Sequence, residues 1–166
     1  MAINYTIREA STADIPVINS LATAIWHHTY LPILSEEQVD YMFDVIYTEQ
    51  ALMQQMLDGQ TFLLLYKEEK PIGFAAYSLK NNKEEIYKLN KIYLLPECQG
   101  SGAGKLLLSQ VEQEIQSLGG NILDLNVNRY NKAKSFYEHC GYTIHEEEDI
   151  PIGPYWMNDF VMRKRL

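Results

Sequence analysis

The sequence has 166 residues, of which 46% are apolar and 22% charged, which is enough to build one buried core. Its 14 Lys and Arg against 22 Asp and Glu give a net charge of −8, which argues against a nucleic-acid partner because phosphate binding needs basic surface. No apolar run approaches the roughly 20 residues that span a bilayer, and neither end has signal-peptide form. We therefore expect one cytoplasmic domain over residues 1–166, with no membrane partner.

The first third of the chain predicts one strand followed by helices. Apolar and polar residues alternate over residues 3–8, as in a half-buried strand, and apolar residues then recur at helical spacing over 12–27. Ser35 with Gln38 three residues later fits a capping box, in which each side chain satisfies a backbone N–H of the other. Two consecutive helical segments are therefore expected within residues 36–57.

The middle of the chain predicts three strands, a helix and a fourth strand. β-branched, aromatic and aliphatic residues dominate residues 61–94, and two turn-like breaks divide them into three antiparallel strands. A helix is expected to begin near Gly102, to carry apolar side chains on one face and to end at Gly119. Residues 122–127 then predict a further strand.

The last part of the chain predicts a short helix over 133–140 and two closing strands over 142–145 and 155–163. The acidic run at 146–149 is expected to connect these two strands. The succession of strands and helices, without an internal repeat or linker, predicts a mixed α+β fold with helices on both faces of a sheet.

The segment 99–104, Gln-Gly-Ser-Gly-Ala-Gly, lies between a predicted strand and a predicted helix. Glycines let a ligand approach the backbone, and the free N–H groups of a helix N-terminus bind phosphate groups. The segment is not a P-loop, because Gln99 and Leu106 replace the required Gly and Ser/Thr, and Lys105 breaks the dinucleotide fingerprint. A tight turn without a ligand is the alternative interpretation.

No disulfide or metal pattern is visible. Cys98 and Cys140 form no CxxC or CxxH pair, which favours reduced thiols. His27 and His28 are adjacent but have no third ligand at metal spacing, so no metal site is expected.

Two motifs together identify a family resemblance. Gln99, Gly102 and Gly104 fit the pattern Gln/Arg-x-x-Gly-x-Gly/Ala. About 30 residues later comes a second motif, and two motifs in their expected elements are more specific than either alone. The second motif consists of Asn131, Ala133, Phe136, Tyr137 and Gly141. Both motifs resemble those of the GNAT acyltransferase superfamily, and the aromatic segments near the chain ends are loosely similar to its diamine and polyamine acetyltransferase-like members.

This resemblance implies a fold and an activity. The fold would be a mostly antiparallel central sheet of about seven strands with helices on both faces. Its two central strands, ending near Leu94 and Val127, would splay apart to admit acetyl-CoA as co-substrate. The activity would be N-acetyl transfer to a primary amine, such as a small polyamine-like acceptor. A non-catalytic acyl-CoA sensor or interaction module on the same fold is the alternative, and a homodimer is one assembly that the resemblance allows.

The resemblance also assigns cofactor-binding residues. Main-chain groups of the fourth strand would pair with the pantetheine arm, and N–H groups of the glycine-rich loop would hold the pyrophosphate. Asn131 would contact the pantetheine, although asparagine at this point is also a suitable helix N-cap. The complete set is Ile92, Tyr93, Leu94, Gln99, Gly100, Ser101, Gly102, Ala103, Gly104, Lys105 and Asn131.

Tyr137 is the expected catalytic residue, because its position matches the family tyrosine that protonates the departing thiolate. A purely structural role in the core is the alternative. No general base is evident, since Asn126, Asn128 and Arg129 occupy one region where relatives carry a glutamate. Glu85 begins the fourth strand, where a solvated turn explains it better.

The acceptor pocket of this family draws on the first helices and the last strands. Trp26, Tyr30 and Tyr155 are candidate acceptor-binding residues there, because aromatic faces attract ammonium groups. Core packing is the alternative for Trp26, and a solvated helix face for most acidic residues nearby.

Overall fold

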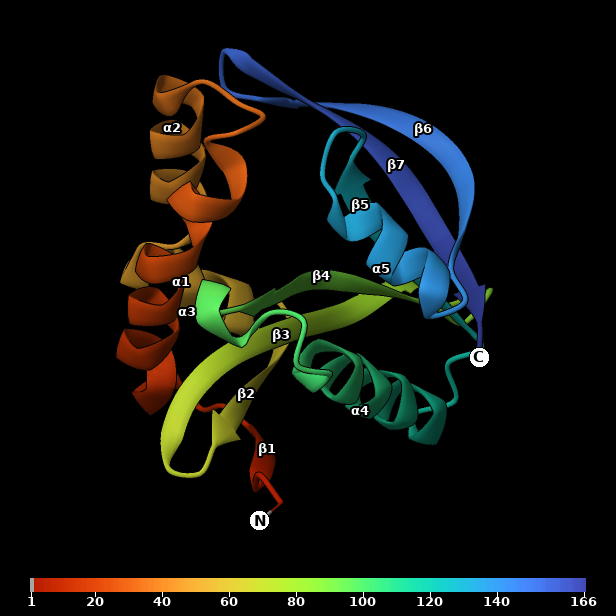
Figure 1. Cartoon of the computed structure of the whole chain (residues 1–166). Helices are drawn as coiled ribbons and strands as arrows, with labels where there is room; N and C mark the ends of the chain where they lie inside the picture. The colour runs from red at the N-terminus through yellow and green to blue at the C-terminus, as the bar shows by residue number, and fades with distance from the viewer. Residues whose placement is uncertain (1) are drawn as a thin grey trace.

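The computed structural model describes residues 2–166, which form one seven-stranded sheet flanked by five α-helices (Figure 1). The strands are β1 (Tyr5–Glu9), β2 (Thr61–Lys67), β3 (Lys70–Asn81), β4 (Ile86–Leu94), β5 (Ile122–Asn128), β6 (Thr143–Ile152) and β7 (Tyr155–Arg165). The helices are α1 (Ile15–Tyr30), α2 (Glu36–Ile46), α3 (Glu49–Leu57), α4 (Ala103–Ser117) and α5 (Ala133–His139). Short 3₁₀ turns precede α1 and follow β4. None of the helices in this part of the chain is long and apolar enough to cross a membrane.

The strand order is β1-β2-β3-β4-β5-β7-β6, and only the central β4–β5 pair is parallel. Helices α1, α2 and α3 pack on one side of the sheet, whereas α4 and α5 cover the other (Figure 1). The first turn of α4 lies against the Phe136 ring of α5. The expected α+β fold, mostly antiparallel with helices on both faces, is therefore confirmed.

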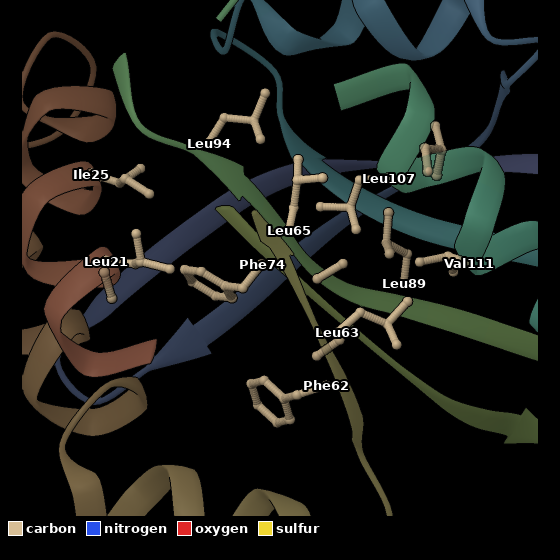
Figure 2. Packing of buried hydrophobic residues seen from close by; sticks show 14 of the residues in the cluster. Leu21, Ile25, Phe62, Leu63, Leu65, Phe74, Leu89, Leu94, Leu107 and Val111 are labelled. Carbon is tan, nitrogen blue, oxygen red and sulfur yellow. The ribbon is translucent and has the colours of Figure 1, made fainter. Parts of the chain in front are cut away.

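The core continues on both sides of the sheet (Figure 2). Leu21 and Ile25 of α1 lie on the side of the Phe74 ring, and Leu107 of α4 lies on the side of Leu65. All five side chains are at most 5% exposed. Each buried side chain of this size contributes about 1.5–3 kcal/mol to folding, so the two helical layers are fixed to the same sheet.

The prediction for the acidic run was wrong. Residues 146–149 lie inside β6, which pairs with β7 from Thr143 to Ile152 with one register shift after Ile144. This strand forms the edge of the sheet, and most of its side chains face solvent. Charged residues on an exposed edge discourage pairing with another chain, which explains a strand of such low hydrophobicity.

The predicted capping box is half formed. The Ser35 hydroxyl accepts the N–H of Gln38 at 3.2 Å, as a helix N-cap does. The Gln38 side chain instead donates to the carbonyl oxygen of Trp156 at 2.8 Å. This bond ties α2 to β7 and thereby connects the helical layer to the far half of the sheet.

Candidate functional site

The two central strands separate halfway along their length. The β4–β5 pairing ends at Leu89 and Leu125, and the β3–β4 register shifts at the neighbouring Asn90. Beyond this point lies a cavity of about 790 Å³, bounded by the open edges of β4 and β5 together with parts of α1, α4 and α5. Such a volume is typical of small-molecule and cofactor sites. The expected splay of β4 from β5 is thus confirmed.

The glycine-rich loop forms one end of this cavity. Gly100 and Gly102 have φ angles of +77° and +88°, which residues with a Cβ atom rarely adopt. Gly102 is the N-cap of α4 and has no capping side chain. The backbone N–H groups of Gly104 and Lys105 in the first helical turn are therefore available to an anion.

Two residues of the predicted loop set lie outside the cavity wall. The Ser101 hydroxyl donates to the carbonyl oxygen of Cys98 at 2.6 Å and accepts the N–H of Ala103 at 3.4 Å. Ser101 and Ala103 do not line the cavity. The Ser101 hydroxyl and the Ala103 N–H are thus engaged with each other and with Cys98 in the turn.

The other predicted cofactor-binding residues do meet at the cavity. The Gln99 side chain donates to the carbonyl oxygen of Leu94 at 3.4 Å and thereby connects the loop to the end of β4. Nine of the eleven predicted cofactor-binding residues line the cavity: Ile92, Tyr93, Leu94, Gln99, Gly100, Gly102, Gly104, Lys105 and Asn131. The Asn131 side-chain oxygen accepts the N–H of Ala133 at 2.9 Å, so this residue also caps the turn that opens α5.

Tyr137 reaches the cavity from α5 and is 8% exposed. Burial, with a contribution from Tyr30, raises the pKa of its phenol well above the usual value. The phenol therefore stays protonated at neutral pH and can act as a proton donor. Its ring packs between those of Phe136 and Tyr142, with centroid distances of 5.4 Å and 6.2 Å.

Of the three candidate acceptor-binding residues, the structure brings only Tyr30 to the cavity. Its hydroxyl lies 2.9 Å from that of Tyr93, and burial raises the pKa of Tyr30 to about 12. Trp26 packs behind Tyr30 at a ring distance of 4.3 Å and is core, in agreement with the alternative interpretation. Tyr155 packs against Tyr41 of α2, at 5.5 Å between ring centroids, and does not line the cavity.

Sequence reasoning missed a buried carboxyl group beside the cavity. Asp159 of β7 is 5% exposed, and the side-chain amide of cavity-lining Asn126 donates to its Oδ2 at 3.3 Å. The strand alternation places Asp159 between Met157 and Val161 on one face, a signal that could have identified it as buried. Glu85, by contrast, lies exposed at the end of β4 remote from the cavity.

Lys91 is a second unexpected buried charge. It is 6% exposed, and its ammonium group donates to the Gln60 side chain at 2.8 Å. Burial, with a smaller effect from Lys88, lowers the pKa of Lys91 to about 7. Within residues 2–166, no group of three or more His, Cys, Asp or Glu side chains is arranged to hold a metal ion.

Comparison with known proteins agrees with this geometry. A family model described as an acetyltransferase (GNAT) domain matches residues 30–157. The chain is 28% identical to a spermidine N(1)-acetyltransferase of Thermoplasma acidophilum, and the match covers 98% of each chain.

Solved structures share the fold. The PaiA N-acetyltransferase of Thermoplasma acidophilum, in complex with coenzyme A, matches with a TM-score of 0.84 and 25% identity, covering 98% of this chain and 99% of that one. A GCN5-related N-acetyltransferase from Rhodopseudomonas palustris matches with a TM-score of 0.83 at 23% identity, covering 100% and 99% of the two chains. With a family model that spans most of its length and this shared fold, the chain belongs to the GNAT family of acetyltransferases.

Proposed function

We propose that this chain transfers the acetyl group of acetyl-CoA to a primary amine of a small polyamine-like molecule. The observation that carries the proposal is the cavity between β4 and β5, which ends at the uncapped first turn of α4. The similarity to a spermidine N(1)-acetyltransferase supports the choice of acceptor.

The residues around the cavity fit acetyl-CoA. The N–H groups of Gly104 and Lys105 suit a pyrophosphate, and the Lys105 side chain adds a positive charge at the same end. The main chain of Ile92–Leu94 faces the cavity without a strand partner from β5, so an extended pantetheine arm can pair with it. Acetyl-CoA supplies an acetyl group that is already activated as a thioester.

Tyr137 is then the proton donor to the departing thiolate. It lines the cavity and keeps its proton at neutral pH, and among the described residues its hydroxyl makes no hydrogen bond that competes for that proton. Tyr30 and Tyr93 form an aromatic wall on the α1 side of the same cavity. Aromatic faces and the acidic protein both suit a cationic acceptor.

Two measurements test the proposal. Titration calorimetry with coenzyme A should give saturable binding, whereas ATP and NAD should not compete. A thiol-release assay with acetyl-CoA and a panel of amines, led by spermidine and putrescine, should then give amine-dependent turnover. Binding of coenzyme A without thiol release for any amine would instead support the acyl-CoA sensor.

A further inference from the structure

Asp159 is a buried carboxylate with one oxygen left unpartnered. The residue is 5% exposed, and within residues 2–166 its Oδ2 receives a hydrogen bond only from the Asn126 amide, at 3.3 Å. Its Oδ1 is fully buried and has no hydrogen-bond partner among the residues that the structure describes. A buried charge without compensation is costly, so such an atom calls for a ligand.

A second carboxylate adds to the uncompensated negative charge at this position. Glu148 of β6 lies directly opposite Asp159 of β7, so the two side chains share one face of the sheet. The Asn126 nitrogen donates to Glu148 as well, at 3.2 Å. One neutral amide thus serves two carboxylates that repel each other across neighbouring strands.

The nearby basic residues Lys88 and Arg129 offset the charge of Asp159 only at a distance, because neither forms an ion pair with its carboxylate. The guanidinium of Arg129 contacts Asp149 and Glu147, and its Nε donates to the main-chain oxygen of Asp159, not to the carboxylate. In the part of the chain that the structure describes, no Lys or Arg forms an ion pair with Asp159.

Asp124 shows what a compensated carboxylate looks like in this fold. It lies on β5 two residues before Asn126, so both side chains are on the same face of the strand, and it is completely buried. Arg163 donates two hydrogen bonds to it, at 2.7 and 2.9 Å, and Lys80 donates a third at 2.8 Å. The lack of an ion-pair partner at Asp159 is therefore local and does not follow from a shortage of basic residues in this sheet.

Asp159 and Glu148 lie one residue behind the cavity wall, since neither lines the cavity but both accept a hydrogen bond from Asn126, which does. Asn126, which binds both acids, lines the cavity, as does Tyr30. The charge of Asp159 is one of the influences that raise the pKa of Tyr30, after burial of the phenol itself. The position is thus close to the aromatic wall and on the α1 side of the sheet.

We infer that Asp159, assisted by Glu148, binds the primary ammonium of the acceptor and takes its proton before the amine attacks. This inference rests on the proposed acetyl transfer and supplies the proton acceptor that the sequence did not reveal. Burial raises the pKa of Asp159 above its usual value, which brings this carboxylate closer to the basicity that proton transfer requires.

The proton balance is complete with the residues present. The first proton leaves the ammonium nitrogen for Asp159, and the neutral amine forms the new N–C bond as the C–S bond breaks. Tyr137 protonates the sulfur, and the second proton lost by the attacking nitrogen restores Tyr137. One proton remains on Asp159 and passes to solvent when the acetylated amine leaves, which matches the overall release of one proton.

The central test is Asp159→Asn, which preserves shape and removes the charge. With spermidine as acceptor, kcat/KM should fall by roughly 10²–10⁴, the usual contribution of a general base, whereas the Kd for coenzyme A should stay unchanged. Glu148→Gln on the solvent-facing edge strand should raise the KM for spermidine several-fold. Glu147→Gln, at the neighbouring position of β6, is the matched control. It should leave kcat/KM and KM for spermidine unchanged.

A pH profile separates proton acceptance from a structural effect. In the wild type, kcat/KM should be level from neutral pH down to the pKa of Asp159. In Asp159→Asn it should rise about tenfold per pH unit towards the pKa of the amine, because only free amine then reacts. Five groups from the surrounding elements influence the titration of this carboxylate. They are Glu148 of β6, Asn126 of β5, Arg129 directly after β5, Lys88 of β4 and Tyr30 of α1.

The outcomes distinguish the two proposals. Failure of the wild type to bind coenzyme A would remove the proposed function and this inference with it. Normal coenzyme A binding and spermidine turnover, with Asp159→Asn within threefold of the wild type, would overturn only the role of Asp159. If Asp159→Asn does not fold, an unchanged spermidine KM in Glu148→Gln would overturn the proposal that Asp159 and Glu148 bind the ammonium.

Discussion

The hydroxyl groups of Tyr30 and Tyr93 lie 2.9 Å apart, where α1 faces the open part of β4. Tyr30 is the last residue of α1, and Tyr93 belongs to the segment of β4 that has no partner in β5. Both residues are largely buried, and both line the cavity. This bond therefore holds the helical layer against the strand segment that forms the cavity wall.

Removal of this hydrogen bond should lower stability by a modest amount. Tyr30→Phe should reduce the free energy of unfolding by about 1 kcal/mol, and more if the Tyr93 hydroxyl is left without a partner. The double variant with Tyr93→Phe should cost less than the sum of the single variants, because the pair is lost only once. Urea denaturation of all four proteins measures this coupling, and strict additivity would contradict a direct bond.

The glycine at the N-cap of α4 should be required for both stability and cofactor binding. Gly102→Ala places a Cβ atom on a residue with φ of +88°, which costs about 1–2 kcal/mol unless the loop changes shape. A changed loop moves the N–H groups of Gly104 and Lys105, so the affinity for coenzyme A should fall at least several-fold.

A second glycine provides the control for that experiment. Gly59 follows α3 with φ of +105°, has open space where a Cβ atom would lie and does not line the cavity. Gly59→Ala should lose a similar free energy of unfolding but keep the affinity for coenzyme A. Equal losses of affinity in both variants, measured by calorimetry, would show that the loop has no special role.

Tyr137→Phe should lower turnover without weakening the fold. Its hydroxyl has no hydrogen-bond partner within residues 2–166, so the free energy of unfolding should change by less than about 0.5 kcal/mol. Loss of the proton donor should decrease kcat by roughly 10²-fold or more, while coenzyme A binding persists.

Substitution of the neighbouring Tyr142 should have the opposite effect, a loss of stability without a loss of turnover. Its hydroxyl donates to Glu112 at 2.6 Å, away from the cavity wall. Tyr142→Phe should therefore reduce stability by about 1–2 kcal/mol and leave kcat near the wild-type value. Comparison of thermal melts and initial rates for the two variants separates catalysis from stability, and a normal rate in Tyr137→Phe would exclude it as the acid.

Much of this site could be predicted because it depends on local backbone requirements. The positive φ angles at Gly100 and Gly102 need glycine, and apolar spacing in the following segment predicts α4. The placement of Ile92 and Leu94 near the cleft comes from the family resemblance, which needs only their position in the fourth strand and not their side-chain contacts. Such features follow from short stretches of sequence.

The remaining features depend on contacts between distant segments. Tyr155 packs on Tyr41 because α2 docks on the β6–β7 hairpin, which no local pattern encodes. The acidic part of β6 is a strand because β7 pairs with it, in spite of its composition. The burial of Asp159 likewise arises only when β5, β6 and β7 come together.

Lys91 should make the stability of the protein depend on pH. Its folded-state pKa of about 7 lies below the value of about 10.4 expected for the unfolded chain, so the unfolded state binds more protons between these values. The free energy of unfolding should therefore rise as the pH increases from about 7 to about 10, and the burial penalty should be largest below pH 7.

Lys91→Met removes this titration and keeps a long side chain beside Phe62. The variant should be more stable than the wild type at pH 6, by an amount on the order of 2–4 kcal/mol, after allowance for the lost bond to Gln60. The advantage should shrink towards pH 10, where the wild-type lysine is largely neutral in both states. Lys67→Met, at an exposed position of β2, should follow the wild-type pH dependence. Parallel curves for Lys91→Met and the wild type would mean that the Lys91 ammonium is solvated.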